Sequence, residues 1–437
     1  MGVTTSTPSR SLGFWTAVAL VMGNMIGSGV FLLPSSLAPF GGISLIGWVL
    51  SAGGSVCLAL VFARLARFNP LAGGPYAYTR QAFGDLPGFL IAWGYWISVW
   101  STEAALSVAL VGYLDPFVPS LVRTPSTAAA MAVALVWVLT VLNVVGLRAA
   151  GRMQVVTTVL KILPLLVIGV AGLVVLDPSH FPITSSGTNL GRDVTAAGTL
   201  TLWAFLGLEC ATIPADSIAD PDRTIPRATI LGTLLTAVIY ILSTVGVMGV
   251  LPPAALARST APFADAARAL AGNGAASLVA LGAAISCFGA LNGWILVAGQ
   301  FPLAVAQDGL FPRVFGVLSN RGTPARGIVI GGVLASALIL MNFSRALVQL
   351  FTFIILLATL STLVPYTFCS VAALLLDRQS PGMRLSRGPM VLAALAFVYS
   401  VWAIAGAGAE VVYSGFLLLL CGLPVYVWVV RGQLPKR

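Results

Sequence analysis

The residues of this chain that could do chemistry begin with glycines in the middle of an apolar stretch. Residues 23–34 read GNMIGSGVFLLP, in which Gly27 and Gly29 flank Ser28. Glycine is less favourable than alanine in a helix interior by about 1 kcal/mol. A helix that opens here exposes N–H groups at the start of its second half, and such a helix end attracts anions. The sequence therefore predicts a break that binds a carboxylate at Ser28 and Gly29.

A second apolar stretch has a matching interruption. Residues 201–217 read TLWAFLGLECATIPADS, with a glycine and then the acid Glu209 in the middle. Carbonyl groups freed at the two breaks can accept hydrogen bonds from an ammonium, and we expect those of Met25, Trp203 and Leu206 to do so. An anion site beside an ammonium site suits the head group of an α-amino acid. The alternative is that the glycines only allow close helix packing.

Two further ionisable residues lie within apolar sequence. Glu103 follows YWISVWST, and Lys161 lies in VTTVLKILPLLV. Ionisable residues inside membrane spans are functional-site candidates by default. The alternative for Glu103 is a structural residue near the external end of its span. The alternative for Lys161 is a side chain that reaches the cytoplasmic surface, because it follows Arg152 by only about two helical turns.

The composition places all these residues in a membrane protein. The 437-residue chain is 58% hydrophobic and only 8% charged, with a mean hydropathy of +0.99, whereas soluble domains have about 25% charged residues. Apolar runs long enough to span a bilayer recur from end to end, so we expect one all-α domain of twelve transmembrane helices. The expected spans cover residues 13–38, 43–66, 83–113, 126–147, 153–176, 196–218, 228–251, 275–305, 327–343, 347–376, 389–408 and 411–430.

The basic residues predict the orientation. With a cytoplasmic N-terminus, 17 of the 23 Lys and Arg residues fall on the cytoplasmic side, five fall outside, and Lys161 stays within a span. The positive-inside rule then places both termini in the cytoplasm of a multi-pass inner-membrane protein. The formal charge of +10 reflects this orientation and predicts no nucleic-acid partner. The five external residues are Arg123, Arg192, Arg258, Arg268 and Arg345.

Candidates for catalysis or metal binding are few. The five cysteines lie apart in apolar segments, and the single histidine, His180, falls in an expected external loop. The sequence has neither a Walker loop nor a strand-linked glycine fingerprint. We therefore expect no metal, no cofactor and no enzymatic activity.

Seven stretches along nearly the whole chain resemble, in order, the amino acid/polyamine/organocation (APC) transporters, and among them the bacterial arginine/agmatine antiporters. The resemblance implies a LeuT-type 5+5 inverted repeat with broken helices 1 and 6, plus helices 11 and 12. The repeats would cover about 13–176 and 196–376, and the additional helices about 389–430. Exchange by alternating access and a homodimer are also implied. The stretches are GNMIGSGVFLLP (23–34), GGPYAYTRQAFG (73–84), TLWAFLGLECA (201–211), PFADAARAL (262–270), GWILVAGQ (293–300), DGLFPRVF (308–315) and TLVPYTFCSVAALLL (362–376).

The resemblance assigns roles residue by residue. It supports Ser28 and Gly29 as carboxylate ligands and the carbonyls of Met25, Trp203 and Leu206 as ligands of the α-amino group. A substrate side chain would pack on an aromatic residue in the middle of the pathway. A tryptophan face there attracts a cation by up to about 2 kcal/mol when desolvated. The matching aromatic residue is Trp294.

The same resemblance predicts gates. Tyr95 and Trp203 match aromatics that gate the extracellular side, whereas Tyr76 and Tyr366 match tyrosines of the intracellular gate. Glu209 matches an acid proposed to sense protons near the site. Without the resemblance, each lone aromatic would be interpreted as core packing or as part of an interface belt.

Three positions depart from the arginine/agmatine pattern. Glu103 replaces an asparagine and Ala358 a serine, both of which help to hold the guanidinium in those antiporters. This pair predicts a pocket for another cation, such as lysine, ornithine or a diamine. Lys161 replaces a small apolar residue. Other superfamily members place a lysine there, in the region that binds sodium in sodium-coupled relatives, so it favours sodium independence and coupling to protons.

The resulting hypothesis is a sodium-independent antiporter that exchanges a basic amino acid for its amine product or a similar cation. A neutral amino acid exchanger or exporter, with or without proton coupling, is the alternative, and Glu103 would then be protonated or outside the pocket. A receptor or scaffold with the same fold is a third class, which would bind substrate without counterflow.

Overall fold

The computed structural model describes residues 12–122, 124–182, 190–341, 347–379 and 387–431. In these residues the secondary structure is helical apart from one isolated bridge, between Leu12 and Ile218. The α-helices are α1 (Phe14–Met25), α2 (Gly29–Leu37), α3 (Ile43–Phe68), α4 (Pro75–Phe83), α5 (Asp85–Tyr113), α6 (Pro119–Val122), α7 (Pro125–Val145), α8 (Leu147–Val174), α9 (Leu190–Leu202), α10 (Pro221–Val250), α11 (Pro253–Leu256), α12 (Pro262–Gln307), α13 (Ala325–Met341), α14 (Leu347–Gln379), α15 (Arg387–Gly406), α16 (Ala409–Leu420) and α17 (Gly422–Arg431). The short 3-10 helices are η1 (Ala38–Phe40), η2 (Pro178–His180), η3 (Trp203–Phe205), η4 (Cys210–Thr212), η5 (Ala215–Ser217) and η6 (Arg313–Gly316).

The helices are long and apolar enough for a multi-pass membrane protein. Within the described ranges, eight helices could cross a membrane by length and composition, or nine if the bent pair formed by α1 and α2 is one span. Large apolar side chains such as Val138, Val167 and Val238 are exposed on the outer helices, as expected where lipid is the solvent. The predicted all-α membrane class is confirmed, and the number of twelve spans stays a prediction.

Both predicted interruptions are present. α1 ends at Met25 and α2 begins at Gly29, and their axes are bent by 41°. In the second stretch, α9 ends at Leu202 and is followed only by short 3-10 turns. Gly207 has φ +105° there, in a region of backbone conformation that residues with a Cβ rarely adopt. Gly207 therefore allows the backbone conformation of the second break.

Close helix packing explains glycines elsewhere in the chain. α8 and α10 cross where Gly169 and Gly172 face Gly246. A Cβ on Gly172 would lie 2.3 Å from the carbonyl oxygen of Gly246, which a folded helix pair cannot accommodate. Small residues of this kind let membrane helices approach closely. The packing interpretation of glycine is thus correct at this crossing, and it also applies to Gly23 and Gly29 of the first stretch, where an added Cβ would lie 2.1 Å from Nε2 of Gln154 and 1.6 Å from Cζ3 of Trp203.

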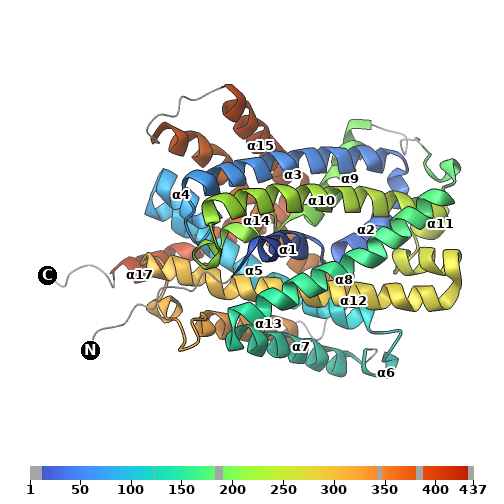
Figure 1. Ribbon diagram of the computed structural model, residues 1–437, viewed down its shortest axis with the longest axis horizontal. Coiled ribbons are helices and arrows are strands. Elements are labelled where there is room, and N and C mark those ends of the chain that lie inside the picture. Colours follow the sequence, from blue (N-terminus) through green and yellow to red (C-terminus); the bar gives the residue numbers. More distant parts are fainter. Residues whose placement is uncertain (1–11, 123, 183–189, 342–346, 380–386, 432–437) are drawn as a thin grey trace.

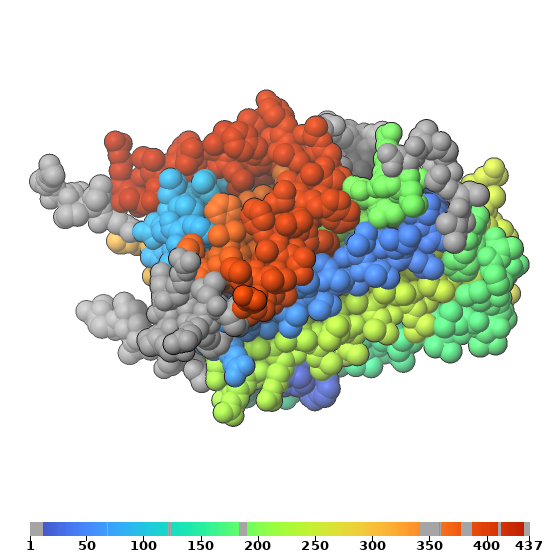
Figure 2. Space-filling view, turned by 90° about the horizontal axis from the view of Figure 1, so that it is seen from above, coloured from blue at the N-terminus to red at the C-terminus, as the bar shows by residue number. Residues whose placement is uncertain are grey.

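The helices are arranged around the broken segments. Figure 1 shows α4 and α17 at one end of the molecule and α6 and α11 at the other, with most long helices running between the two ends. α8, α10 and α12 pack against α1, and α5 packs against α12 and α14. On the face seen in Figure 2, the orange and red segments of α14 to α17 lie beside blue α3 and yellow-green α10.

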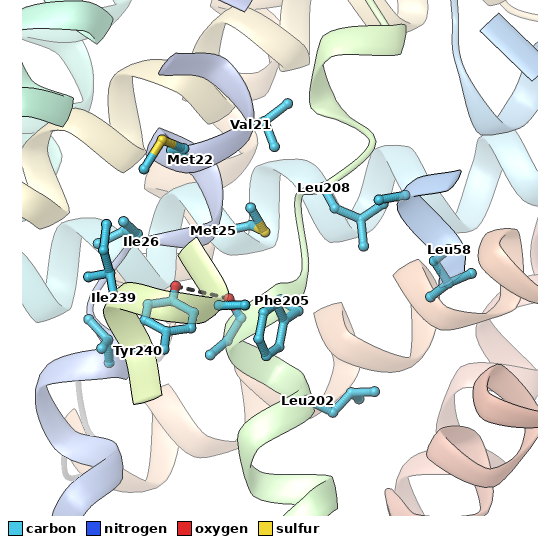
Figure 3. Close-up of a cluster of buried hydrophobic side chains, with 14 of the residues drawn as sticks. Val21, Met22, Met25, Ile26, Leu58, Leu202, Phe205, Leu208, Ile239 and Tyr240 are labelled. Carbon is cyan, nitrogen blue, oxygen red and sulfur yellow. Dashed lines mark hydrogen bonds between the residues drawn. The ribbon is translucent and has the colours of Figure 1, made fainter. Parts of the chain in front are cut away.

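A cluster of buried apolar side chains holds the two breaks against each other. Figure 3 shows Met25 and Ile26 facing Phe205 and Tyr240, with other apolar side chains of α1, α9 and α10 around them. The Tyr240 hydroxyl donates a hydrogen bond of 3.0 Å to the carbonyl of Ala204, in the second break. Since lipid tails are as apolar as these side chains, tight packing and this hydrogen bond supply the stability.

Candidate functional site

The two breaks line one small cavity. Its volume is about 50 Å³, below the roughly 300–1,000 Å³ usual for a drug-sized ligand. Seven of the eight predicted substrate-binding residues line it. They are Met25, Ser28, Gly29, Trp203, Leu206, Trp294 and Ala358. The arrangement is therefore a nearly closed pocket at the junction of the broken helices.

The first break presents donors to this cavity. Gly29 is the first residue of α2, so its N–H points out of a helix N-terminus, and the Ser28 hydroxyl is buried without a hydrogen-bond partner in the described ranges. Trp203 lies directly on Gly29, because a Cβ there would be 1.6 Å from Cζ3 of the indole ring. These donors can bind a carboxylate that lies beneath the Trp203 ring.

Lys161 lies at the other half of the same break. Its Nζ donates hydrogen bonds to the carbonyl oxygens of Gly23 at 2.7 Å, Ile26 at 2.6 Å and Ser286 at 3.4 Å. The Ser286 hydroxyl itself lies 3.2 Å from the Ile26 oxygen. A cation beside the last carbonyls of α1 is favoured by the helix dipole. The Lys161 side chain is fully buried, so it does not reach the surface as the alternative interpretation required.

Glu209 accepts hydrogen bonds from two tyrosine side chains. Its carboxylate accepts a hydrogen bond of 2.5 Å from the Tyr95 hydroxyl and another from the Tyr366 hydroxyl, and the Gly207 N–H donates to the same Tyr366 oxygen. All of these side chains are buried. A carboxylate shared between α5 and α14 can hold those helices together in one conformation.

This geometry corrects the predicted grouping of the gates. Tyr95 was expected to act with Trp203 on the extracellular side, but it shares the Glu209 carboxylate with Tyr366. The physical reason is its place along α5, because Tyr95 precedes the cavity residue Thr102 and lies toward the Asp85 end of the helix. Tyr95 therefore belongs with Tyr366.

A polar cluster lies beyond these residues at the α4 end of the molecule (Figure 1). The Tyr76 hydroxyl donates to Oδ2 of Asp308 at 3.0 Å, and Arg80 pairs with the same carboxylate at 2.8 Å. Arg80 also pairs with Asp85 at 2.7 Å. Burial, and then the Asp308 charge, raise the pKa of Tyr76, so the phenol keeps its proton and acts as a donor. The cluster joins α4 to the end of α12.

The structure places Glu103 outside the cavity, which corrects the expectation that it lines the pocket. Its neighbours on α5 that line the cavity are Thr102, Ala105 and Leu106. Consecutive residues of a helix point about 100° apart, so Glu103 projects toward α12 and α13. A Cβ on Gly331 would lie 3.7 Å from its Oε1.

Some cavity residues escaped the sequence interpretation. Thr102 and Thr362 add hydroxyl groups to the lining, and Asn24 adds an amide whose Nδ2 has no partner in the part of the chain that the structure describes. Asn24 ends a buried row of amides in which Gln154 donates to Asn24 at 3.4 Å and Asn292 donates to Gln154 at 2.9 Å. Amide side chains within apolar spans were the available signal.

A larger cavity of about 670 Å³ lies on the opposite side of the breaks from Asp308. It is lined by α2, α5 and α12, and includes Phe31, Tyr113 and Arg268. The Tyr113 hydroxyl donates to the carbonyl of Ser28 at 3.2 Å, so the wall of the large cavity contacts the first break directly. The small cavity thus has a spacious neighbour on one side and the Glu209 and Asp308 clusters on the other.

Known proteins match this chain over nearly its full length. The model of the amino acid permease family matches residues 12–426. The chain is 35% identical over 373 residues to the cadaverine/lysine antiporter of Escherichia coli, with 83% of each chain covered. It is 35% identical to a putative arginine/ornithine antiporter of Bacillus subtilis, with 96% of this chain and 97% of the relative covered. It is 30% identical to the putrescine transporter PotE of Escherichia coli, with 98% and 97% covered.

Proposed function

The chain belongs to the amino acid permease family, and from this premise we propose that it is a sodium-independent antiporter. Its substrates would be a basic amino acid and the amine product of that amino acid, or a similar cation. One observation carries the proposal, namely that both helix breaks line the same small cavity. There the N–H groups of Ser28 and Gly29 would bind the carboxylate, and the carbonyls of Met25, Trp203 and Leu206 the α-ammonium.

The preference for cationic side chains rests on Trp294 and on the relatives. The Trp294 ring lines the cavity, and its face attracts an ammonium or guanidinium group. Thr102 and Thr362 add neutral acceptors for the same group. The relatives are named for lysine and cadaverine, arginine and ornithine, and putrescine, all of which are amines or basic amino acids.

Sodium independence rests on Lys161. Its ammonium donates hydrogen bonds to the carbonyl oxygens of Gly23, Ile26 and Ser286. A sodium ion bound at this place would need the same kind of oxygen ligands. A fixed ammonium there supplies the positive charge that keeps the end of α1 in place. The proposal also assigns proton coupling or sensing to Lys161 and Glu209.

The finer architecture is also proposed. The break between α1 and α2 and the one after α9 open two segments of similar length, which supports a LeuT-type 5+5 inverted repeat over about 13–176 and 196–376, with two more helices at about 389–430. Twelve spans, cytoplasmic termini in an inner membrane, one transporter domain and a homodimer complete this picture.

Alternating access then follows from the two sides of the cavity. The 670 Å³ cavity bounded by Tyr113 would be the external vestibule. Trp203, which covers Gly29, would separate the bound substrate from that vestibule. Tyr95 and Tyr366 on Glu209, and then Tyr76 on Asp308, would close the cytoplasmic path.

One observation favours the second candidate, a neutral amino acid exchanger. Of the described residues that line the cavity, none is an acid, because Glu103 points away from it. A neutral side chain could pack on Trp294 as well as a cationic one. Competition between the two substrate classes therefore decides between the candidates.

Counterflow in proteoliposomes tests the proposal. Vesicles that contain the purified protein and unlabelled lysine should accumulate labelled lysine, and external cadaverine should compete. The rate should be the same in sodium and in choline buffers. Competition by leucine but not by cadaverine would favour the neutral exchanger, and no counterflow with any amino acid or amine would contradict transport. Vesicles without protein are the control.

A further inference from the structure

Glu103 is a buried acid that the substrate cavity does not use. Its side chain has 0% exposure, and neither carboxyl oxygen has a hydrogen-bond partner in the described ranges. Glu209, the other buried acid of these helices, instead accepts hydrogen bonds from Tyr95 and Tyr366. Glu103 thus differs from Glu209 in having nothing that stabilises a negative charge.

The surroundings of Glu103 are small and apolar. It faces the contact between α12 and α13, where Gly331 and Ala298 lie against each other. A Cβ on Gly331 would lie 3.7 Å and 3.8 Å from the two carboxyl oxygens and 3.2 Å from the Cβ of Ala298. The nearest neighbours of the carboxyl group on this side are therefore a glycine and an alanine, neither of which can donate a side-chain hydrogen bond to it.

Few charged groups lie on the described parts of the helices next to Glu103, and Arg326 of α13 is exposed to solvent whereas Glu103 is buried. α7 has none, α13 has Arg326 more than one turn before Gly331, and α12 has Asp265 and Arg268 near its start. On the side of α14, the nearest titratable cluster is that of Glu209. It contacts α5 at Tyr95, about 12 Å along the helix from Glu103 by the rise per residue.

An ionised carboxylate in such a place is strongly disfavoured. A charge buried in apolar surroundings without a partner has a high free energy, and the group takes up a proton instead. Glu103 is therefore neutral as long as no positive charge is nearby. A cation that enters the cavity changes this balance, because Thr102, the adjacent residue, lines the cavity.

We propose that Glu103 is a proton-binding site whose occupancy follows the charge of the substrate in the cavity. This inference rests on the proposed exchange of a basic amino acid for an amine. A basic amino acid brings a net charge of one, since its carboxylate cancels one ammonium, whereas a diamine brings two. One extra positive charge about 10 Å away changes a proton-binding equilibrium by about tenfold at an effective dielectric constant near 20.

The charges of the exchange then balance. The basic amino acid crosses with the Glu103 carboxyl protonated, so the substrate and the proton together move two positive charges. When the diamine binds on the other side, the carboxyl O–H bond breaks and the proton passes to the water on that side. The diamine also moves two positive charges, with Glu103 ionised. Glu103 then regains a proton from the side to which the diamine leaves.

Proton release on binding tests this inference. Purified protein in a weakly buffered detergent solution with a pH indicator is titrated with lysine or with cadaverine, and calorimetry measures binding in the same samples. Near neutral pH, cadaverine should release more protons per bound molecule than lysine. Glu103→Gln should abolish the difference, whereas the control variant Asp222→Asn, at an exposed acid in the first turn of α10, should retain it.

Infrared spectroscopy gives a second measurement, on the unmodified protein. A carboxyl group without hydrogen bonds has a C=O stretch at higher frequency than one that accepts from two tyrosines, as Glu209 does. The high-frequency band should lose intensity when cadaverine binds and be absent in Glu103→Gln. Equal proton release for both substrates, or a band that Glu103→Gln leaves unchanged, would overturn the inference alone. Failure of lysine and cadaverine to bind would overturn the proposed function and this inference with it.

Discussion

At the scale of single residues, the cavity depends on the absence of a side chain at Gly29. The Trp203 ring occupies the space into which a Cβ would project, at 1.6 Å from Cζ3. The Ser28 hydroxyl next to it is buried and has no partner in the described part of the chain. A glycine is thus needed so that an aromatic ring can cover the N-terminal end of α2, which we propose to bind the substrate carboxylate, while the donors there stay free.

The first prediction therefore concerns Gly29→Ala. The added methyl group should displace the Trp203 ring and weaken lysine binding by at least tenfold, which corresponds to about 1.4 kcal/mol. Calorimetry on the purified protein in detergent measures the affinity. The matched control is Gly53→Ala on α3, where nothing lies within 4 Å of the new Cβ. Equal effects of the two substitutions would contradict the role of Gly29.

The residue scale also shows where sequence reasoning succeeds. Ser28, Gly29, Trp203 and Trp294 were predicted to lie together, and all of them line one cavity. Helix-breaking glycines are local signals, because they describe the backbone of the span itself. The aromatic residues were placed by the family resemblance, because a lone aromatic in apolar sequence would otherwise be interpreted as core packing or as part of an interface belt. The prediction that Glu103 lines the pocket was wrong, because an acid within a span indicates a functional site but does not show which way its side chain points.

At the scale of helices, the direction of a side chain depends on helix phase. Thr102, Ala105 and Leu106 show the spacing of one helix face, and Glu103 lies on the next face. The position of Tyr95 is likewise a matter of depth along α5, which places it on the Glu209 carboxylate. Phase and depth relative to neighbouring helices are set by tertiary packing, so the sequence alone could not supply them.

The second prediction concerns the connection between α4 and α12. Asp308 accepts a hydrogen bond from Tyr76 and pairs with Arg80, and both contacts weaken when the charge is removed. Asp308→Asn should loosen α4 by about 1 kcal/mol, the usual net value of such contacts at partly exposed sites. Hydrogen–deuterium exchange in nanodiscs should show about fivefold faster exchange in α4.

A matched variant separates this connection from general charge effects. Asp85→Asn removes the other carboxylate that pairs with Arg80, but Asp85 is more exposed than Asp308 and has no bond to Tyr76. Its effect on exchange in α4 should be smaller. If Asp85→Asn loosens α4 as much as Asp308→Asn does, then Asp308 is not the residue that holds α4 to α12.

At the scale of the whole molecule, the two ends have different structures. One end has α4 and α17, and the other has α6 and α11 (Figure 1). The Asp308 cluster lies at the first end and the 670 Å³ cavity at the second. The distribution of basic residues predicts that the first end faces the cytoplasm. Hydropathy and the distribution of basic residues are properties of the whole sequence. The membrane-protein class and the orientation in the membrane can therefore be predicted without knowledge of tertiary contacts.

Chemical labelling of single cysteines tests this orientation. Ala257, beside α11, and Asn320, in the connection between α12 and α13, are both exposed and lie at opposite ends of the long helix α12. In a variant whose five native cysteines are replaced by serine or alanine, Ala257→Cys should react with a membrane-impermeant maleimide added to intact cells. Asn320→Cys should react only after the cells are opened, because the positive-inside rule places it in the cytoplasm. The opposite pattern would invert the molecule and make the 670 Å³ cavity cytoplasmic, whereas equal labelling of both positions in intact cells would contradict a single orientation.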